Sequence, residues 1–258
     1  MATSPLTADL WYHIEKLLPR PIKKPYGPGR PACDFQQVMS GIIWVLKSGA
    51  RWKDLPQDYP SYQTCHRRFQ QWSELGLFRK VLSDLVKKAS REGKIDLSES
   101  YIDGSYVPAK KGGTLVKSST RGIGSKIVAI IDRNRNPISL EVTSANFHDV
   151  RFVEPLIRER LLRNKVSTII GDKAFDSDPL DRRLHRRGIE LIAPNRDWKL
   201  VKTQDKRRLR RIKRRWSIER FFAHLKNYRR IAIRWECKAQ NYLSMVHLAC
   251  ICVIYNEF

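Results

Sequence analysis

The sequence predicts an α/β protein in two parts, a small all-α domain over residues 1–95 and a mixed sheet flanked by helices over residues 96–258. Before residue 95, apolar residues recur at the three- and four-residue spacings of amphipathic helices. After it, short β-branched runs alternate with helical segments, as in α/β domains. Hydrophobic residues make up 41% of the 258 residues, which is enough to bury a sizeable core.

The chain is strongly basic. It has 50 Lys and Arg residues against 26 Asp and Glu residues, a formal net charge of +24 at pH 7. A globular protein with this charge repels itself, and a polyanion is the usual compensation. A ribosomal protein or a binder of membrane surfaces is the alternative. However, the basic residues are interleaved with Trp, Tyr, Phe and Ile, so we expect a folded protein that binds nucleic acid.

The sequence gives no sign of a membrane or secretory protein. No run reaches the ~18 apolar residues of a membrane span. The nearest, from Tyr242 to Tyr255, is interrupted by Ser244 and His247, so we expect a buried helix there. The first ten residues lack the basic start and apolar core of a secretory signal. The five cysteines form no CxxC pair, which favours reduced thiols in a bacterial-type cytoplasm over a zinc site or disulfides.

The first part is expected to contain helices over residues 7–18, 35–48, 61–75 and 78–91. Thr7 is placed to cap the first of these helices, and Gly49 to end the second. In the third, we expect one face to be buried, comprising Tyr62, Cys65, Phe69 and Trp72. The opposite face carries His66, Arg67, Arg68, Gln70 and Gln71.

That polar face makes Arg67, Arg68 and Gln71 candidate DNA contacts of a helix-turn-helix-type domain. Arg and Gln side chains on an exposed helix are suited to reading base edges or gripping phosphates. The alternative is a solvated face without a ligand, because helix-turn-helix signals in a single sequence are weak.

The second part predicts the element order β-β-β-α-β-α-β-α, a mixed sheet with helices on both faces. The strands are expected over residues 100–107, 126–132, 137–143, 167–171 and 189–193, and the helices over 150–162, 180–187 and from about 205 onward. The segment from Asn134 to Asn136 is the tight turn of a hairpin between the second and third strands.

Three acidic residues stand at informative places in this order. Asp103 lies inside the first strand, Asp172 follows the fourth strand, and Glu219 lies on a late helix. Buried or rim carboxylates are costly unless a positive group neutralises them. A salt bridge explains any single acid in so basic a protein. Three acids at such positions favour hard oxygen ligands for one or two Mg²⁺ ions beside a phosphate.

Basic residues surround the third acid. Arg215, Glu219 and Lys226 form a stripe at spacings of four and seven, beside the buried positions of the same helix. Eight of the ten residues from Lys206 to Arg215 are basic, and Arg211 and Arg214 belong to this tract. The tract fits a nuclear or RNA-type basic segment as well. Because it leads directly into an acidic site, we favour a DNA track, with Arg211, Arg214, Arg215 and Lys226 as contacts.

Several motifs together resemble bacterial DDE transposases of the insertion sequence 5 family. The three catalytic segments of that family resemble Asp103-Gly-Ser105, Asp172-Lys-Ala-Phe175 and Arg215-Trp-Ser-Ile-Glu219 with Lys226. The match continues through the segments Phe221–Arg230 and Arg234-Trp-Glu236. The amino-terminal domain of that family is similar to three segments here, Gly29-Arg-Pro31, Gly49-Ala-Arg-Trp-Lys-Asp-Leu-Pro56 and Arg68-Phe-Gln-Gln-Trp72. The resemblance therefore covers nearly the whole chain.

The resemblance implies a ribonuclease H-like catalytic fold. It also implies that Asp103, Asp172 and Glu219 share two Mg²⁺ ions, with Mn²⁺ as a substitute. The implied reaction is metal-dependent cleavage at the terminal inverted repeats of a mobile element, followed by transfer of a 3′-hydroxyl to target DNA. Its implied partners are double-stranded DNA and further copies of the chain, in a dimer or a larger assembly on the nucleoid.

Two departures and two alternatives stay open. In the family, a Tyr usually stands three residues before the Arg that corresponds to Arg215, and this chain has Ile212 there. If that Tyr helps to hold DNA ends, this chain holds them more weakly or uses another residue. Ala174 replaces a common Gly. His148 and Asp149 are candidates to touch the site, with helix capping by Asp149 equally compatible. The alternative functions are a ribonuclease H-like nuclease without strand transfer and a domesticated or inactive relative that only binds DNA.

Overall fold

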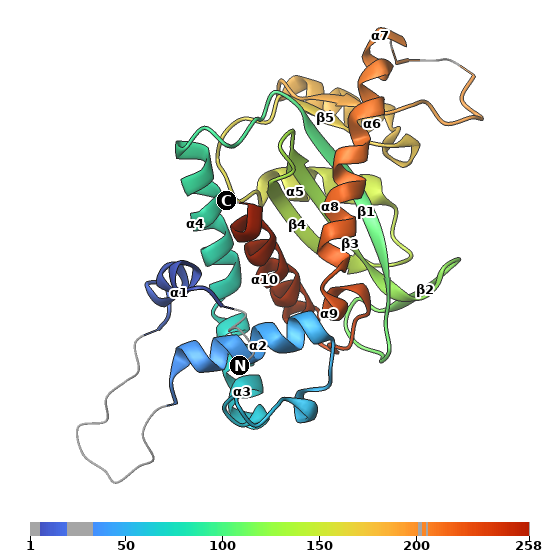
Figure 1. Cartoon of the computed structure of the whole chain (residues 1–258). Coiled ribbons are helices and arrows are strands. Elements are labelled where there is room, and N and C mark those ends of the chain that lie inside the picture. The colour runs from blue at the N-terminus through green and yellow to red at the C-terminus, as the bar shows by residue number, and fades with distance from the viewer. Residues whose placement is uncertain (1–5, 20–32, 201–202, 205, 258) are drawn as a thin grey trace.

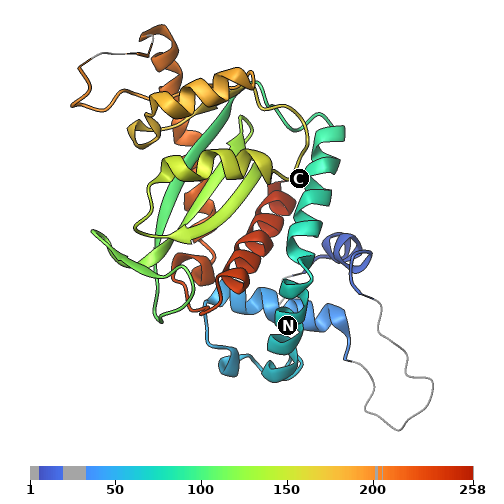
Figure 2. The ribbon, with the colours of Figure 1, turned by 180° about the vertical axis from the view of Figure 1, so that it is seen from behind.

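The computed structural model describes residues 6–19, 33–200, 203–204 and 206–257. A six-stranded mixed sheet lies at its centre, and helices pack on both faces of the sheet (Figures 1 and 2). The motif Gly29-Arg-Pro31 lies outside the described residues. None of the described helices is long and apolar enough to cross a membrane.

The strands are β1 (Ser100–Pro108), β2 (Lys117–Ser119), β3 (Gly122–Asp132), β4 (Pro137–Ser144), β5 (Thr168–Ile170) and β6 (Glu190–Ile192). The sheet has the order β2-β3-β1-β5-β6, and β4 pairs with β3. β1, β2 and β4 are antiparallel to β3, whereas β1, β5 and β6 are parallel to one another. This order, with an antiparallel hairpin on one side of β1 and parallel strands on the other, confirms the ribonuclease H-like mixed sheet.

The first part of the chain holds α1 (Ala8–Glu15), α2 (Phe35–Ser48), η1 (Trp52–Asp54), α3 (Tyr62–Glu74) and α4 (Leu77–Arg91). The second part holds η2 (Asp149–Phe152), α5 (Val153–Arg158), η3 (Lys173–Phe175), α6 (Asp178–Arg186), α7 (Lys206–Leu209), η4 (Arg210–Arg215), α8 (Trp216–Lys226), α9 (Arg229–Ala232) and α10 (Ala239–Glu257). The Thr7 cap is confirmed, because its hydroxyl accepts a hydrogen bond from the Leu10 amide at 3.3 Å.

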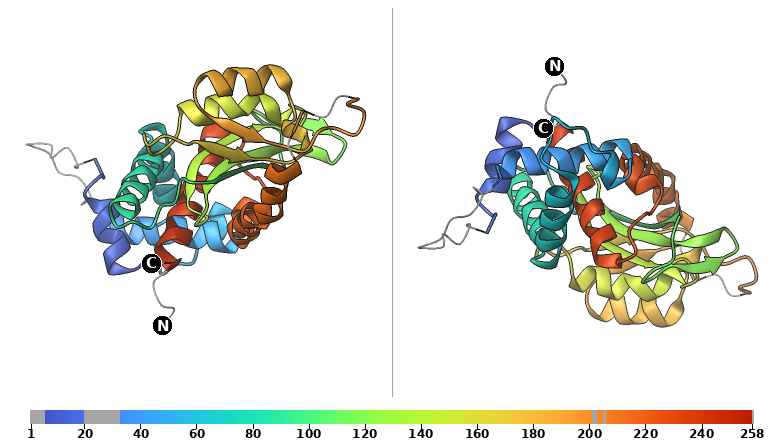
Figure 3. Two further views of the ribbon diagram at one scale, coloured as in Figure 1. Left: turned by 90° about the horizontal axis from the view of Figure 1, so that it is seen from above. Right: turned by 90° about the horizontal axis from the view of Figure 1, so that it is seen from below.

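Alternate residues of the strands feed two separate hydrophobic clusters. On β3, the side chains of Ile127, Ala129 and Ile131 join the cluster that contains α8 and α10. Those of Val128 and Ile130 join the cluster that contains α5 and α6. This two-residue period puts the two pairs of helices on opposite faces, as Figure 3 shows from above. Whether a side chain of β3 faces α8 or the opposite helices therefore depends on its place in this two-residue alternation, and the same holds for the other strands.

Helix α10 connects the two parts of the chain. Its buried residues, among them Tyr242, Met245 and Ala249, belong to the same cluster as Val81 and Val86 of α4. The helix lies between α4 and the sheet (Figure 1). The expectation of a buried helix near the end of the sequence is confirmed. The division at residue 95 stays a prediction, and one hydrophobic cluster extends across it.

Several expected elements differ from those observed. The strand β2 and the first residues of β3 were not expected; they form a short hairpin extension through Gly122. Helix α5 ends at Arg158, because the Arg160 guanidinium donates to the carbonyls of Ile157 and Arg163 and so replaces the next helical turn. Tyr62 was expected to be buried but is 40% exposed.

A buried ion pair joins the end of α2 to the segment after α9. Arg230 Nε donates to Glu236 Oε1 at 2.7 Å, and both side chains are 5% exposed. Arg230 Nη1 also donates to the carbonyl of Ala50 at 2.8 Å. Glu236 lies between α9 and α10, in no helix, so the expectation of helix from about residue 205 onward is wrong at this position.

We expect Glu236→Gln to lower the free energy of unfolding by about 3 kcal/mol, because the substitution leaves the Arg230 guanidinium buried without a counter-charge. The matched control is Glu74→Gln, which removes the exposed pair with Lys238 and should change stability by less than about 1 kcal/mol. Urea unfolding followed by circular dichroism measures both variants. Equal stability of the two variants would contradict this role for the pair.

Candidate active site

Asp103 lies in the middle of β1, paired with Ala129 of β3. It is two residues beyond Tyr101, whose side chain belongs to the cluster that contains α8, so its own side chain points to that face of the sheet. Asp103 Oδ1 accepts a hydrogen bond from the Gly104 amide at 2.7 Å. The side chain is 20% exposed, which leaves it reachable from solvent but mostly desolvated.

Asp172 lies at the matching position of the neighbouring parallel strand. The register pairs Tyr101 of β1 with Ile170 of β5, and Asp103 and Asp172 each follow that pair by two residues. Asp172 begins the turn η3, where its Oδ1 accepts from the Ala174 amide at 2.8 Å. Adjacent strands are about 4.8 Å apart, so Asp172, just beyond the end of β5, is a neighbour of Asp103 in the middle of β1.

Arg215 links the carboxylates of Asp103 and Glu219. Its Nη1 donates to Asp103 Oδ2 and its Nη2 to Glu219 Oε1, each at 3.0 Å. The side chain of Arg215 is 20% exposed, whereas that of Glu219 in the first turn of α8 is 59% exposed. The guanidinium therefore occupies the space between the two acids and compensates their charge.

The electrostatics of Asp103 reflect these neighbours. Burial raises the pKa of its carboxyl above the usual value, and the nearby charge of Asp172 raises it further. The Arg215 guanidinium and the Gly104 amide act in the opposite direction on that pKa without overcoming burial. The site thus favours a cation close to Asp103.

Lys226, at the other end of α8, also faces β1. Its Nζ donates to the carbonyl of Tyr106 at 3.1 Å. Burial lowers the pKa of this amine, and the charge of Arg121 lowers it further. The stripe of Arg215, Glu219 and Lys226 therefore lies along β1, and the predicted buried positions Ile218, Phe221 and Leu225 pack into the core.

The acids form no complete metal-ligand cluster by themselves. Among the residues that the structure describes, no three His, Cys, Asp or Glu side chains are grouped as ligands of one ion. The Arg215 guanidinium stands between Asp103 and Glu219 and bridges these two carboxylates. The donor set still fits a hard divalent cation, because it consists of carboxylate oxygens around a position that a cationic group already occupies.

Comparison with known proteins identifies the family. Residues 96–254 match the family described as "Transposase DDE domain". The chain belongs to this family. It is therefore a DNA transposase, and enzymes of this family act with divalent metal ions. Residues 6–82 match a second family, described as "Putative transposase of IS4/5 family", so the helical first part has relatives of its own.

Individual relatives agree with this assignment. The transposase is 34% identical over 116 residues to the "Insertion element IS402 uncharacterized 16.2 kDa protein" of Burkholderia cepacia, a match that covers 44% of this chain and 79% of that protein. It is 32% identical over 141 residues to the "Putative transposase for insertion sequence element IS402" of the same species, covering 52% and 64%. It is 30% identical over 137 residues to the "Putative transposase for insertion sequence element IS6501" of Brucella ovis, covering 49% and 94%.

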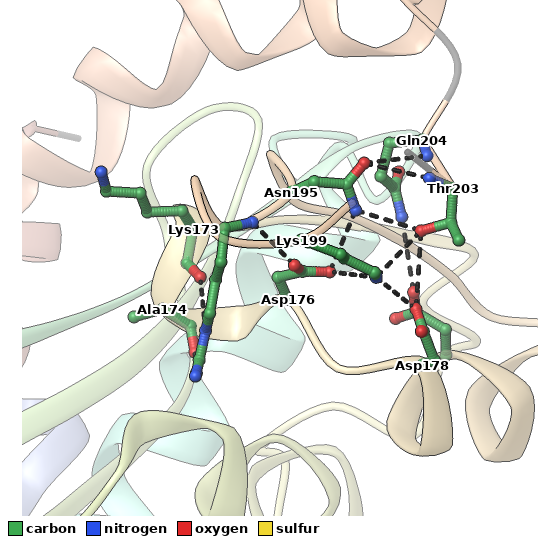
Figure 4. Close-up of polar contacts among 10 residues, drawn as sticks. Lys173, Ala174, Asp176, Asp178, Asn195, Lys199, Thr203 and Gln204 are labelled. Carbon is green, nitrogen blue, oxygen red and sulfur yellow. Dashed lines mark hydrogen bonds and ion pairs between the residues drawn. The ribbon is translucent and has the colours of Figure 1, made fainter. Parts of the chain in front are cut away.

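A network of polar side chains holds the segment after Asp172 in place. Asp176 accepts hydrogen bonds from the Arg196 amide at 2.8 Å and from Lys199 Nζ at 3.1 Å (Figure 4). The Arg196 guanidinium in turn donates to the carbonyl of Ala174 at 3.3 Å. The loop after β6 therefore braces the turn that carries Asp172. Sequence reasoning missed this network, because its partners lie about twenty residues apart in loops.

Glu99 engages two of the expected DNA contacts. Arg211 Nε and Arg214 Nη1 donate to its Oε1 at 2.6 and 2.8 Å. Burial alone would raise the pKa of Glu99, but the hydrogen bonds from the two arginines outweigh burial and hold that pKa below its usual range. These arginines thus attach η4 to the start of β1. Ile212, between them, packs against the core.

Asp149 is an acid on the opposite face of the sheet from Asp103. Its Oδ1 accepts from Lys126 Nζ at 2.8 Å, and a Cβ at Gly104, which follows Asp103 on β1 and so faces the other way, would lie 3.1 Å from that same oxygen. His148 is the N-cap residue of η2 and its side chain makes no capping hydrogen bond, and Asp149 lies in the first turn. The sequence gives no reason to single out Lys126 as the partner of Asp149, because a lysine within a strand belongs to no recognisable motif.

The polar face of α3 is only partly free. Arg67 is exposed, as expected. Arg68 is half-buried: its guanidinium lies 5.1 Å from the Phe35 ring and donates to Gln71 Oε1 at 2.9 Å. Arg67 and Gln71 are therefore available to a ligand, whereas Arg68 also packs against the core of the helical region.

We expect Gly171→Ala to destabilise the transposase by about 1–3 kcal/mol, because a Cβ there would lie 2.8 Å from the Phe175 ring, which is fully buried. The strain caused by this substitution would arise at the residue that directly precedes Asp172. The matched control is Gly112→Ala, where a Cβ would meet nothing within 4 Å. Thermal unfolding of both variants is the measurement, and an unchanged midpoint for Gly171→Ala would mean that Phe175 moves freely.

Proposed function

We propose that Asp103, Asp172 and Glu219 are the metal-binding carboxylates of this transposase, and that they hold two Mg²⁺ ions, with Mn²⁺ as a substitute. The main support is the matching position of Asp103 and Asp172 on adjacent parallel strands, with Arg215 joining Asp103 to Glu219. When bound, such ions acidify the attacking water or 3′-hydroxyl and stabilise the leaving oxygen.

The chain's own groups prepare this reaction. Asp103 is positioned by β1 and Asp172 by the braced turn η3, so neither depends on a flexible loop. Arg215 holds Glu219 near Asp103, and a metal ion held by the acids would release its guanidinium for a DNA phosphate. Lys226 is half-buried beside Tyr106 and supplies a second positive group on the same stripe.

The proposed substrate is double-stranded DNA that carries the terminal inverted repeats of a mobile element, together with a target duplex. Arg67 and Gln71 on α3 are proposed to contact the repeats, with Arg68 placed behind them. The exposed side of Arg214 is proposed to contact the phosphate backbone while its other side holds Glu99. Arg211 contributes mainly by fixing η4.

The assembly and location follow from the same chemistry. Residues 1–95 are proposed as the part that binds the element's ends and residues 96–258 as the part that cuts them. Two ends must be held together for strand transfer, so we propose at least a homodimer on DNA. The substrate lies on the bacterial nucleoid in the cytoplasm, where the five cysteines would stay as free thiols.

We expect Asp103→Asn, Asp172→Asn and Glu219→Gln each to reduce DNA cleavage by at least about a hundredfold while leaving DNA affinity level or higher. Each substitution removes a negative ligand without adding bulk, so it removes the electrostatic stabilisation of the reaction but also a repulsion of DNA. The assay incubates end-labelled DNA carrying the element's repeats and a target duplex with Mg²⁺ or Mn²⁺, and it maps cut ends and joined products.

The control for these variants is Glu74→Gln, an exposed carboxylate far along the chain from the three acids. It should cut like the unmodified protein. Full activity in any of the three acid variants would remove that residue from the assignment. Cut ends without joined products in the unmodified protein would instead indicate a nuclease without strand transfer.

We expect Arg215→Gln to tighten Mg²⁺ or Mn²⁺ binding by roughly tenfold in the absence of DNA. The guanidinium competes for the space between Asp103 and Glu219, and a unit charge at 4 Å near a protein surface is worth up to about 4 kcal/mol. Isothermal titration calorimetry measures the metal affinity. The matched control is Arg220→Gln, an exposed arginine on the same helix, which should change it by less than about twofold. Weaker metal binding in Arg215→Gln would show that Arg215 assembles the site and does not compete for it.

A further inference from the structure

A cavity of about 730 Å³ lies between η1 and α3 on one side and the segment between α9 and α10 on the other. Its lining includes Trp52 and Lys53 of η1, and Trp235 and Glu236 of the later segment. None of the three catalytic carboxylates lines it. The size lies within the range of sites that enclose a small ring system.

The cavity is built from two motifs that the catalytic assignment leaves without a role. The first is Gly49-Ala-Arg-Trp-Lys-Asp-Leu-Pro56, and the second is Arg234-Trp-Glu236. Arg230 joins them, because it pairs with Glu236 and donates to the carbonyl of Ala50. At Gly49, whose φ is +70°, a Cβ would lie 2.7 Å from Arg229. The walls are therefore held together before any ligand binds.

Aromatic rings form much of the lining. The centroid of the Trp52 ring lies 4.8 Å from that of His66 and 5.5 Å from that of Phe69, and both pairs are tilted, by 35° and 36°, which fixes the orientation of Trp52. Burial lowers the pKa of His66, and the Arg230 charge lowers it further, so this ring is neutral near pH 7. Trp235 is half-buried, and Tyr62 of the lining is 40% exposed. Apolar flat surfaces thus remain open to the cavity.

The polar part of the lining is positively charged. Lys53 and Lys111 are exposed, whereas Arg51, which precedes η1, is already ion-paired with Asp54 at 2.7 Å. Glu236 is the acid of the lining, and its carboxylate is already paired with Arg230. A ligand therefore meets flat rings inside and free cationic groups at the edge, which is the combination that proteins use for bases and phosphates of unpaired strands.

We propose that this cavity binds one unpaired nucleotide of the DNA substrate, with its base against Trp52 and Trp235 and its phosphate at Lys53 and Lys111. The proposal rests on the transposase acting on DNA and adds to it a contact outside the three carboxylates. A paired base is covered by its neighbours in the stack and cannot enter a cavity, so the occupant must be unpaired. A ligand that consisted of phosphate alone would use the cationic groups of the lining but would leave the aromatic rings without a contact.

The test compares two fluorescent DNA probes of the same sequence, a fully paired duplex and a duplex with one unpaired base, by anisotropy at a fixed salt concentration. The unmodified protein should bind the second probe roughly tenfold more tightly, within the range of about 1–3 kcal/mol per stacked base. Trp235→Ala should remove this preference and leave affinity for the paired duplex within about twofold, and Trp235→Phe should restore it. The Asp103→Asn variant should keep the preference.

Two controls separate the cavity from general DNA attraction. Trp198→Ala removes an aromatic ring that is 73% exposed outside the cavity and should keep the preference. Lys53→Ala with Lys111→Ala should reduce it, whereas the same double change at the exposed Lys80 and Lys87 of α4 should lower the affinity for both probes equally. Circular dichroism melting of every variant confirms that it is folded.

Three outcomes would overturn the proposal. Equal binding of the two probes by the unmodified protein, with normal cleavage, would reject the cavity and leave the catalytic assignment intact. A preference that survives Trp235→Ala would place the unpaired base elsewhere. Binding of a deoxynucleoside monophosphate as tightly as the unpaired probe would make the occupant a free nucleotide. Absence of cleavage by the unmodified protein, with an intact preference, would instead count against the catalytic assignment alone.

Discussion

The burial of the Asp103 carboxylate, with Asp172 as a second negative charge nearby, is the constraint on which this site depends. Two acids at matching positions of adjacent strands need a cation near them, and Arg215 supplies it. That requirement sets the position of α8. Its preceding turn is attached to Glu99 near the start of β1, Arg215 meets Asp103 at the middle, and Lys226 meets Tyr106 toward the end. The helix therefore follows β1 along a line of polar contacts.

The charge of the chain has two separate uses. Part of the basic tract is neutralised within the fold, since Arg211 and Arg214 share the buried carboxylate of Glu99. Such pairs position helices and contribute little to the attraction of DNA. The formal net charge of +24 is the excess of Lys and Arg over all acids, including those in such pairs. Cations therefore remain after every acid is matched with one, and these cations can face solvent. Exposed groups such as Arg67 and Lys53 belong to this excess, and their effect on binding depends on ionic strength.

Much of the fold could be predicted from the sequence, because it follows from short-range patterns. The period of β3 and its flanking turn gave the hairpin, and the residues Ile218, Phe221 and Leu225 gave the buried side of α8. The positions of Asp103 inside β1 and of Asp172 just after β5 were also readable, because each lies in or directly after a short run of apolar and β-branched residues.

The contacts that complete the site could not be predicted in this way. Arg215 meets Asp103, and Arg211 meets Glu99, across more than a hundred residues of sequence, and no local spacing signals such a pair. Glu236 was read as part of a helix because its neighbours are helical, whereas its ion pair with Arg230 holds it in the connection between α9 and α10. The pairs of Arg215 and Arg211 join residues far apart in the sequence, whereas Arg230 and Glu236 are only six residues apart, so only the first two pairs were beyond the reach of local spacing.

The position of α10 has a consequence for synthesis of the chain. Residues of α4, which ends at Arg91, pack against α10, which begins at Ala239. A ribosome adds roughly 5–20 residues per second, so the apolar side of α4 emerges well before its partner, by an interval of roughly seven to thirty seconds. During that time the part of α4 that packs against α10 lacks this cover, although α3 already lies against the helix. The nascent chain is thus a client for chaperones, and a messenger truncated before α10 yields a sticky, non-functional product.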